Sequence, residues 1–270
     1  MTDPVAAFGE RFGGPPSHVA RAPGRVNLIG EHIDYNGLPV LPMALQRGVA
    51  LAFRPRADGL VVLHTNAPGL APLELEIRPG LEPYGGGHWG DYAQGVAHEL
   101  ARRFAAWRGL DGLVASDLPA GAGLASSSAL VTALGLALAH INEVDLEQGA
   151  FAELMAEAER FTGTRGGVMD HAVSLGARSG CAVKISFAPL RLQHIPLPEG
   201  WRFVVADTGV RAQKSGPARK AYNLRRAECE EALSRVVDEV VRTGASRTTP
   251  TGHADLMREL GRDAALELGE

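Results

Sequence analysis

Alternating apolar and polar positions predict short β-strands in the first half of the chain. Leu73–Arg78 alternates leucine or isoleucine with charged residues, which is the pattern of a strand with one buried face. Val49–Arg54 and Leu60–Thr65 are apolar runs rich in Val, Leu and Ala, and Leu113–Leu118 is a shorter run of the same kind. We therefore expect strands at these positions.

A helical period of apolar residues predicts helices between and after these strands. Leu146–Phe161 places its apolar residues on one stripe, and Ser126–Ile141 opens on serines, which are favoured at helix starts. Helices are also expected over Ala6–Phe12 and Trp89–Arg103. A glycine-rich turn, Gly163–Asp170, is expected to follow.

The pattern changes after Gly180, where strands come first and a long helix follows. The expected strands are Cys181–Phe187, Leu192–Leu197 and Arg202–Asp207, and the helix is Pro217–Arg242. The tail after residue 244 has only weak helical character. A domain boundary is therefore expected near 177–180, giving domains 1–178 and 179–270, and the mixture of antiparallel-looking strands with helices makes the fold class α+β.

Composition and charge fit a globular protein that binds neither nucleic acid nor membranes. The 270 residues are 45% apolar and 21% charged, with a formal net charge of −4. Cys181 and Cys229 are too few and too far apart for a disulfide framework or a zinc site. The most apolar segment, Val131–Ile141, is too short to span a bilayer, and no signal-peptide pattern occurs. We expect a cytoplasmic protein.

Two glycine-bearing segments carry the strongest chemical signals. Arg25–Asp34 concentrates Arg, Asn, Glu, His and Asp side chains, which suit hydrogen bonding to sugar hydroxyls. Gly121–Ser128 is a flexible turn running into a helix start, whose free N–H groups bind phosphate. Taken separately, Arg25–Asp34 could be a polar loop whose side chains pair with one another in salt bridges. Gly121–Ser128 could be a tight turn with a serine cap. Together they indicate an enzyme that moves phosphate onto a polyol.

Gly121–Ser128 is neither of the two familiar nucleotide motifs. No Gly-Lys-Ser/Thr occurs in the chain, so it is not a Walker loop. Gly121 and Gly123 lack the third glycine of a dinucleotide fingerprint.

Four further residues offer candidate chemistry. Asp170 follows paired glycines at a turn, where it is either a helix N-cap or a group projecting into a cleft, the latter if Arg25 lies beside it. Glu157 and Glu159 are equally good candidates to hold Mg²⁺, because both lie about equally far from the apolar stripe of their helix. Tyr222 could stack on a sugar ring or pack against the core.

The neighbours of Tyr222 have a simpler interpretation. Arg225, Arg226 and Glu228 are expected on a solvated helix face with an Arg–Glu pair.

The combination of motifs resembles the galactokinases of the GHMP sugar and metabolite kinase superfamily. Arg21–Leu45 is similar to the galactokinase signature, and Leu118–Leu130 to the ATP-binding loop of the superfamily. Phe161–Ser174 resembles the segment of the catalytic Asp, and Ala221–Cys229 the sugar-side helix of the C-terminal domain. The motifs occur in the family's order and cover nearly the whole chain.

The resemblance implies a fold, a reaction and a set of site residues. The fold would be an N-terminal domain like ribosomal protein S5 and a truncated ferredoxin-like C-terminal domain. The reaction would be an ATP- and Mg²⁺-dependent transfer of the γ-phosphoryl group to the C1 hydroxyl of α-D-galactose, by a monomer. Catalytic roles would fall to Asp170 and Arg25, and the metal would bind Ser127 and Glu159. The substrate residues would be Glu31, His32, Asp34, Gly167 and Tyr222, and the ATP residues Gly121, Ala122, Gly123, Leu124, Ala125, Ser126 and Ser127.

The chain also departs from the family pattern at several positions. Ala125 stands where serine is usual, and His171 where glutamine is usual, which would alter the sugar pocket. Glu159–Ser174 is closer to the N-acetylgalactosamine kinase branch, whereas Tyr222 and Asn36 fit the galactose branch. N-acetylgalactosamine kinase is therefore the alternative enzyme.

The family's third motif, a glycine-rich loop near the C-terminus, is absent after residue 244. A truncated kinase is the expected explanation. The absence of this motif also leaves open two alternatives, an inactive kinase and a non-catalytic sensor that binds galactose and ATP.

Overall fold

Strand β2 (Pro42–Pro55) is the longest strand of the N-terminal sheet and pairs with β1 on one side and with β5 on the other. The computed structural model describes residues 3–104, 108–119, 121–206, 209, 217–246 and 248–261. The sheet has the order β1-β2-β5-β3-β4, and all its neighbouring strands are antiparallel except β3 and β5. Its other strands are β1 (His18–Asn27), β3 (Leu60–Thr65), β4 (Leu73–Glu76) and β5 (Leu110–Ser116).

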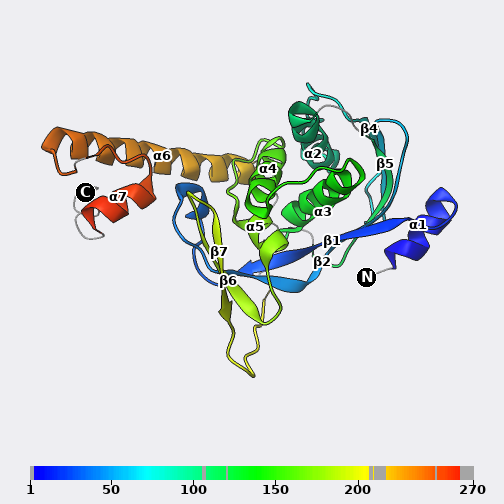
Figure 1. Ribbon diagram of the computed structural model, residues 1–270, viewed down its shortest axis with the longest axis horizontal. Helices are drawn as coiled ribbons and strands as arrows, with labels where there is room; N and C mark the ends of the chain where they lie inside the picture. The colour runs from blue at the N-terminus through cyan, green and yellow to red at the C-terminus, as the bar shows by residue number, and fades with distance from the viewer. Residues whose placement is uncertain are drawn as a thin grey trace.

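Four helices lie together over one face of this sheet (Figure 1). They are α2 (Gly90–Arg103), α3 (Ser126–Ile141), α4 (Gln148–Arg160) and α5 (Met169–Gly176). Helix α3 is apolar on nearly all sides, so it is buried between the sheet and its neighbouring helices. Alternate residues of β2, such as Leu51 and Phe53, point into this core.

The opposite face of the sheet is covered by helix α1 (Pro4–Phe12). Phe8 of this helix packs on Ala52 and Leu113, which lie between the inward residues of their strands. The sheet is therefore buried on both sides at its centre.

The second part of the chain begins with a hairpin of β6 (Cys181–Ser186) and β7 (Arg191–Pro196). Ile185 of the hairpin bridges to Val40 and shares a small apolar cluster with Met169 of α5. The expected boundary between 178 and 179 falls between α5 and this hairpin and stays a prediction.

Two helices follow the hairpin. Helix α6 (Pro217–Thr243) extends away from the sheet in Figure 1. Helix α7 (His253–Leu260) folds back against α6, where Leu256 packs on Val240. No helix among the described residues is both long enough and apolar enough to cross a membrane.

Most of the expected elements are present with shifted ends, and the fold class α+β is confirmed. Three elements differ from the sequence-based expectation. β1 was not anticipated, because Pro23 and Gly24 interrupt its apolar pattern and mark a register shift in the strand. The expected turn at 163–170 ends in helix α5. Residues 202–206 form no strand, and Asp207 lies outside the described residues.

Candidate functional site

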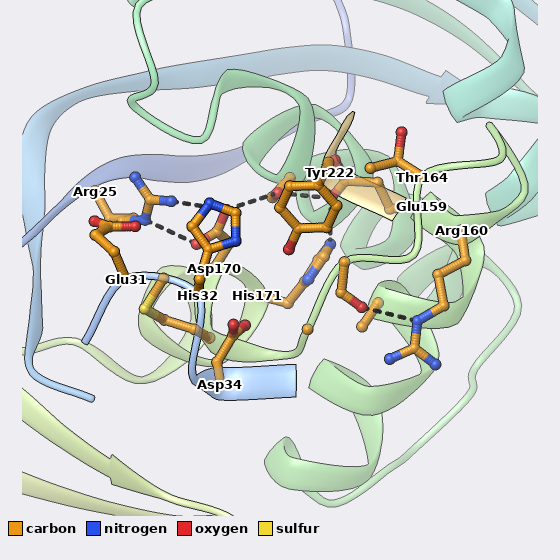
Figure 2. Close-up of a pocket in the computed structure, with 15 residues that line it drawn as sticks. Arg25, Glu31, His32, Asp34, Glu159, Arg160, Thr164, Asp170, His171 and Tyr222 are labelled. Atoms are coloured by element: carbon orange, nitrogen blue, oxygen red, sulfur yellow. Dashed lines mark hydrogen bonds and ion pairs between the residues drawn. The ribbon is translucent and has the colours of Figure 1, made fainter. Parts of the chain in front are cut away.

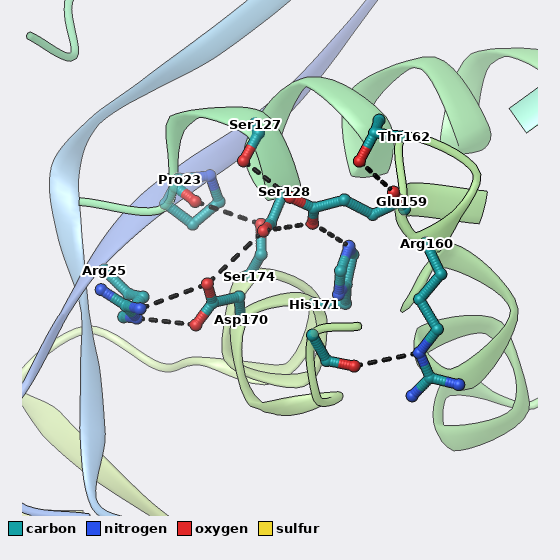
Figure 3. Close-up of polar contacts among 11 residues, drawn as sticks. Pro23, Arg25, Ser127, Ser128, Glu159, Arg160, Thr162, Asp170, His171 and Ser174 are labelled. Carbon is teal, nitrogen blue, oxygen red and sulfur yellow. Dashed lines mark hydrogen bonds and ion pairs between the residues drawn. The ribbon is translucent and has the colours of Figure 1, made fainter. Parts of the chain in front are cut away.

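An ion pair between Arg25 and Asp170 lies at the centre of the site. Arg25 follows the register shift in β1, and Asp170 lies in the first turn of α5. Arg25 Nε donates to Asp170 Oδ1 at 2.7 Å and Nη2 to Oδ2 at 3.2 Å (Figure 3). The two side chains are 13% and 16% exposed, so the pair is largely withdrawn from water. A two-point contact of this kind fixes the carboxylate and the guanidinium in one plane.

Arg25 also ties its strand to the glycine-rich loop. Its backbone N–H donates to Leu124 O at 3.1 Å, and its Nη1 donates to Gly123 O at 2.6 Å. Burial alone would lower the pKa of Arg25, but the Asp170 carboxylate, helped by Glu31 and Asp34, raises it above its ordinary value. The guanidinium therefore stays charged beside the glycine-rich loop.

One side of the ion pair opens into a polar cavity, which we call the sugar cavity (Figure 2). Its walls come from the segment after β1, from α4 and α5, from the loop between them and from the start of α6. The residues that line it are Arg25, Glu31, His32, Asp34, Ser128, Ala156, Glu159, Arg160, Thr164, Gly166, Gly167, Met169, Asp170, His171 and Tyr222. All five residues expected to bind the sugar are therefore brought together here.

Gly167 allows Asp34 to approach the backbone before α5. A Cβ at position 167 would lie 1.9 Å from Asp34 Oδ2, so a larger residue there would displace the carboxylate. Burial, followed by repulsion from Asp170, raises the pKa of Asp34 above its usual range, although hydrogen bonds from the backbone of Tyr35 and Met169 oppose the shift. The ionised form of Asp34 is therefore disfavoured in the folded protein.

Three aromatic rings meet at the mouth of the sugar cavity. The His32 ring lies 5.2 Å from the Tyr222 ring and 5.9 Å from the Tyr35 ring, between centroids. His32 Nδ1 and the Tyr35 hydroxyl are 2.9 Å apart. Burial raises the pKa of Tyr222, so its hydroxyl stays protonated. This arrangement offers ring faces and hydroxyl groups to a polyol.

The other side of the ion pair opens into a second hollow, the phosphate hollow. It is lined by Arg25, Tyr92, Gly121, Gly123, Leu124, Ala125, Ser126, Ser127 and Asp170. Of the residues expected to bind ATP, only Ala122 does not line this hollow; Ala120, which precedes the loop, lies outside the described residues.

Helix α3 begins at Ser126 as expected, but the alternative of a serine cap is wrong. The residue at the N-cap is Ala125, in the left-handed conformation with φ 58° and ψ 37°, and no side chain caps the helix. The three serines occupy the first turn instead. The first turn of a helix is a general binding position for anions, because its N–H groups find no acceptor further along the helix.

Glu159 lies behind the serines and is only 7% exposed. Ser127 Oγ donates to Glu159 Oε1 at 2.7 Å, and Ser128 Oγ donates to Oε2 at 2.6 Å (Figure 3). His171 Nε2 lies 3.1 Å from Glu159 Oε2, so the residue that replaces the family's glutamine contacts this carboxylate. Glu157 points elsewhere and pairs with Arg103 at 2.5 Å. The structure thus distinguishes two carboxylates that periodicity could not.

The Ser127–Glu159 pair suits a magnesium ion. Mg²⁺ prefers oxygen ligands at about 2.1 Å in octahedral geometry, which places adjacent ligands about 3 Å apart. The 2.7 Å between Ser127 Oγ and Glu159 Oε1 is close to that separation. No three His, Cys, Asp or Glu side chains gather as a metal site among the described residues. Phosphate oxygens and water would therefore have to complete the coordination.

Several lining residues were missed by the sequence analysis. Ser128 is buried and also lies 3.5 Å from Asp170 Oδ2, and Thr164 is buried in the cavity wall. Arg160 donates from Nε to Gly166 O at 2.9 Å, and burial lowers the pKa of its guanidinium. Ser128 could have been predicted, because it belongs to the same run of serines as Ser127. Thr164 and Arg160 could not, because no local sequence pattern distinguishes them from other polar residues.

Comparisons with known proteins agree with this geometry. The galactokinase galactose-binding signature matches residues 6–55, and the GHMP kinases N terminal domain matches residues 91–177. A galactokinase of Chloroflexus aggregans is 42% identical over 232 residues, which cover 84% of this chain and 57% of the relative. A galactokinase of Streptomyces coelicolor is 36% identical over 264 residues, covering 96% and 64%.

Solved structures match the fold as well. The Lactococcus lactis galactokinase complexed with galactose superposes with a TM-score of 0.73 at 23% identity, covering 98% of this chain and 69% of that one. The mevalonate kinase of Methanococcus jannaschii gives a TM-score of 0.53 at 18% identity, over 66% of this chain and 56% of that one. The family models and the relatives place the chain in the GHMP kinase superfamily, and the solved structures share its fold. Within that superfamily, the chain belongs to the galactokinase family, and it spans 57% of the length of the Chloroflexus aggregans relative.

Proposed function

We propose that this chain carries the site of an ATP-dependent sugar 1-kinase, which phosphorylates the C1 hydroxyl of α-D-galactose. The observation that carries the proposal is the Arg25–Asp170 pair, which lines both the sugar cavity and the phosphate hollow. A group transferred between ligands in these two hollows would pass beside this pair. The galactokinase relatives support galactose as the acceptor.

Asp170 and Arg25 would act on the two reacting groups. The Asp170 carboxylate would orient the attacking hydroxyl or accept its proton, while Arg25 holds the carboxylate in place and stabilises the charge on the transferring phosphoryl group. Phosphoryl transfer depends on such positioning and charge neutralisation more than on covalent help.

The remaining expected residues would hold the two substrates. Glu31, His32 and Asp34 would bind sugar hydroxyls, and Tyr222 would lie over the sugar ring. Gly167 would contribute by leaving space for the Asp34 carboxylate. The backbone of Gly121–Ser127 would surround the phosphates of ATP. Ser127 and Glu159 would hold Mg²⁺, which when bound neutralises phosphate charge. Under this proposal the enzyme is a cytoplasmic monomer.

Two alternatives have specific support. The resemblance of Glu159–Ser174 to the N-acetylgalactosamine branch makes that sugar the second candidate acceptor. A binding protein without turnover, which would hold the two ligands in these two hollows, is the candidate of another class. The complete set of Arg25, Asp170 and the serine run argues for catalysis, because a sensor does not need all of them.

The test is an assay of the purified chain with ATP, Mg²⁺ and either D-galactose or N-acetyl-D-galactosamine, with D-glucose as the control. We expect ATP consumption with galactose and a phosphate on C1 of the product, detected by phosphorus NMR. A clear preference for the acetylated sugar would change the substrate. Binding of galactose and ATP without product would favour the binding protein and contradict the proposed catalysis.

A further inference from the structure

Arg225 and Arg226 are neighbours on α6, but they lie in different environments. The Arg225 side chain is 61% exposed and pairs with Glu228 on the same helix. The Arg226 side chain is 18% exposed and points toward the body of the protein. The expected solvated helix face therefore describes Arg225 and not Arg226.

Arg226 contacts the loop 162–167, which forms one wall of the sugar cavity. Its Nη1 donates to Arg165 O at 2.6 Å. Asn223, one turn earlier, accepts from Arg165 N at 3.0 Å and donates from Nδ2 to Gly163 O at 2.9 Å. Arg219, another turn back, donates to Thr162 O at 2.9 Å. The spacing of these three helix residues places them on one face of α6. Their side chains thus bind the backbone of the loop.

The same arginine also contacts the segment after β1, which contributes another wall of the cavity. The guanidinium carbon of Arg226 lies 5.7 Å from the centroid of the Tyr35 ring, within the range of a cation–π contact. Tyr35 in turn contacts His32, which lines the cavity beside Tyr222. Glu230 accepts from Arg226 at 3.1 Å and from Arg165 at 2.7 Å, so it balances the positive charge gathered here.

We propose that Arg226 is a positioning residue that fixes the distance between the two walls of the sugar cavity. The role rests on the proposed function, because it concerns the site assigned to the sugar. Removing Arg226 deletes a side chain that contacts both the loop before Gly167 and Tyr35, while Asn223 and Tyr222 of α6 keep their own contacts with the loop and with Tyr35. Sugar affinity then falls, while the phosphate hollow, which Arg226 does not line, is unaffected.

The experiment compares Arg226→Gln with Arg225→Gln, which remove the same group from adjacent positions. Binding of D-galactose and of ATP with Mg²⁺ is measured by calorimetry for each variant and for the unmodified chain. We expect Arg226→Gln to weaken galactose binding about 10-fold, comparable with other lost charged hydrogen bonds, with ATP binding unchanged. Arg225→Gln should change neither. In turnover assays the sugar KM should rise with little change in kcat.

Arg226→Lys is the conservative variant. A lysine keeps the charge but cannot reach the Arg165 carbonyl, Glu230 and the Tyr35 ring together, so galactose binding should be intermediate. Galactose affinity in Arg226→Gln within twofold of the unmodified chain would overturn this inference and leave the proposed function standing. Equal losses of galactose and ATP binding would also overturn it, because they indicate a general structural role. If the unmodified chain binds neither galactose nor N-acetylgalactosamine, both the inference and the proposed function fail.

Discussion

The sugar cavity and the phosphate hollow share one ion pair, but they are built from different parts of the chain. The cavity is lined by side chains from four separate segments, including Asp34, His171 and Tyr222. The hollow is lined mainly by one continuous loop and the start of α3, with Arg25, Tyr92 and Asp170 beside them. Substitutions in the cavity should therefore affect sugar binding individually, whereas the loop Gly121–Ala125, whose proposed contacts are made by its backbone, should tolerate side-chain changes that keep its conformation.

The largest effect is expected from Asp170→Ala, which removes the shared carboxylate. Turnover should fall by at least ~10³-fold, because Asp170 is the carboxylate that forms an ion pair with Arg25 among the described residues. ATP affinity should stay largely intact, since the hollow keeps its backbone. Single-turnover kinetics and nucleotide binding measure the two quantities. An equal loss of ATP affinity would assign Asp170 to nucleotide binding instead.

Arg25→Ala should have the next largest effect. We expect kcat to fall by roughly 10²- to 10³-fold and by more than KM rises, as for a group that acts mainly on charge in the transition state. Steady-state kinetics with galactose and with ATP separate the two constants. A change confined to the sugar KM would reassign Arg25 to ground-state binding.

A matched pair of glycine substitutions tests the two regions directly. Gly167→Ala introduces a Cβ that would lie 1.9 Å from Asp34 Oδ2, so galactose affinity should fall by roughly 10-fold or more. Gly123→Ala meets no atom within 4 Å and carries only the strain of its φ of 73°, about 1–2 kcal/mol of stability. Calorimetric titrations should show galactose binding unchanged in Gly123→Ala. Similar galactose losses in both variants would remove the distinction between the regions.

The smallest effect is expected from Asp34→Asn on stability. Folding raises the pKa of Asp34, so its ionised form is disfavoured in the folded protein and destabilises it at neutral pH. The variant should melt ~2 °C higher at pH 7 while it binds galactose more weakly. As the pH falls below the raised pKa, Asp34 becomes protonated and the two melting temperatures should converge. A melting temperature at pH 7 below that of the unmodified chain would contradict this assignment.

The sequence was sufficient for elements and residues with strong local patterns. The apolar residues of 126–141 identified α3 with its observed bounds, and the glycine-rich segments identified the loop and the neighbourhood of Asp170. It could not choose between Glu157 and Glu159, because the choice depends on Arg103 and the serines, which are distant in sequence. Nor could it separate Arg226 from Arg225, because only the packing of α6 on the loop 162–167 makes them different.

The most direct test of the central claim is a crystal structure of the chain with galactose and a non-hydrolysable ATP analogue. The account predicts the C1 hydroxyl within hydrogen-bonding distance of Asp170, with the γ-phosphate on the other side of the pair, beside Arg25 and the start of α3. Galactose bound away from Asp170, or a different hydroxyl directed at the γ-phosphate, would contradict the account.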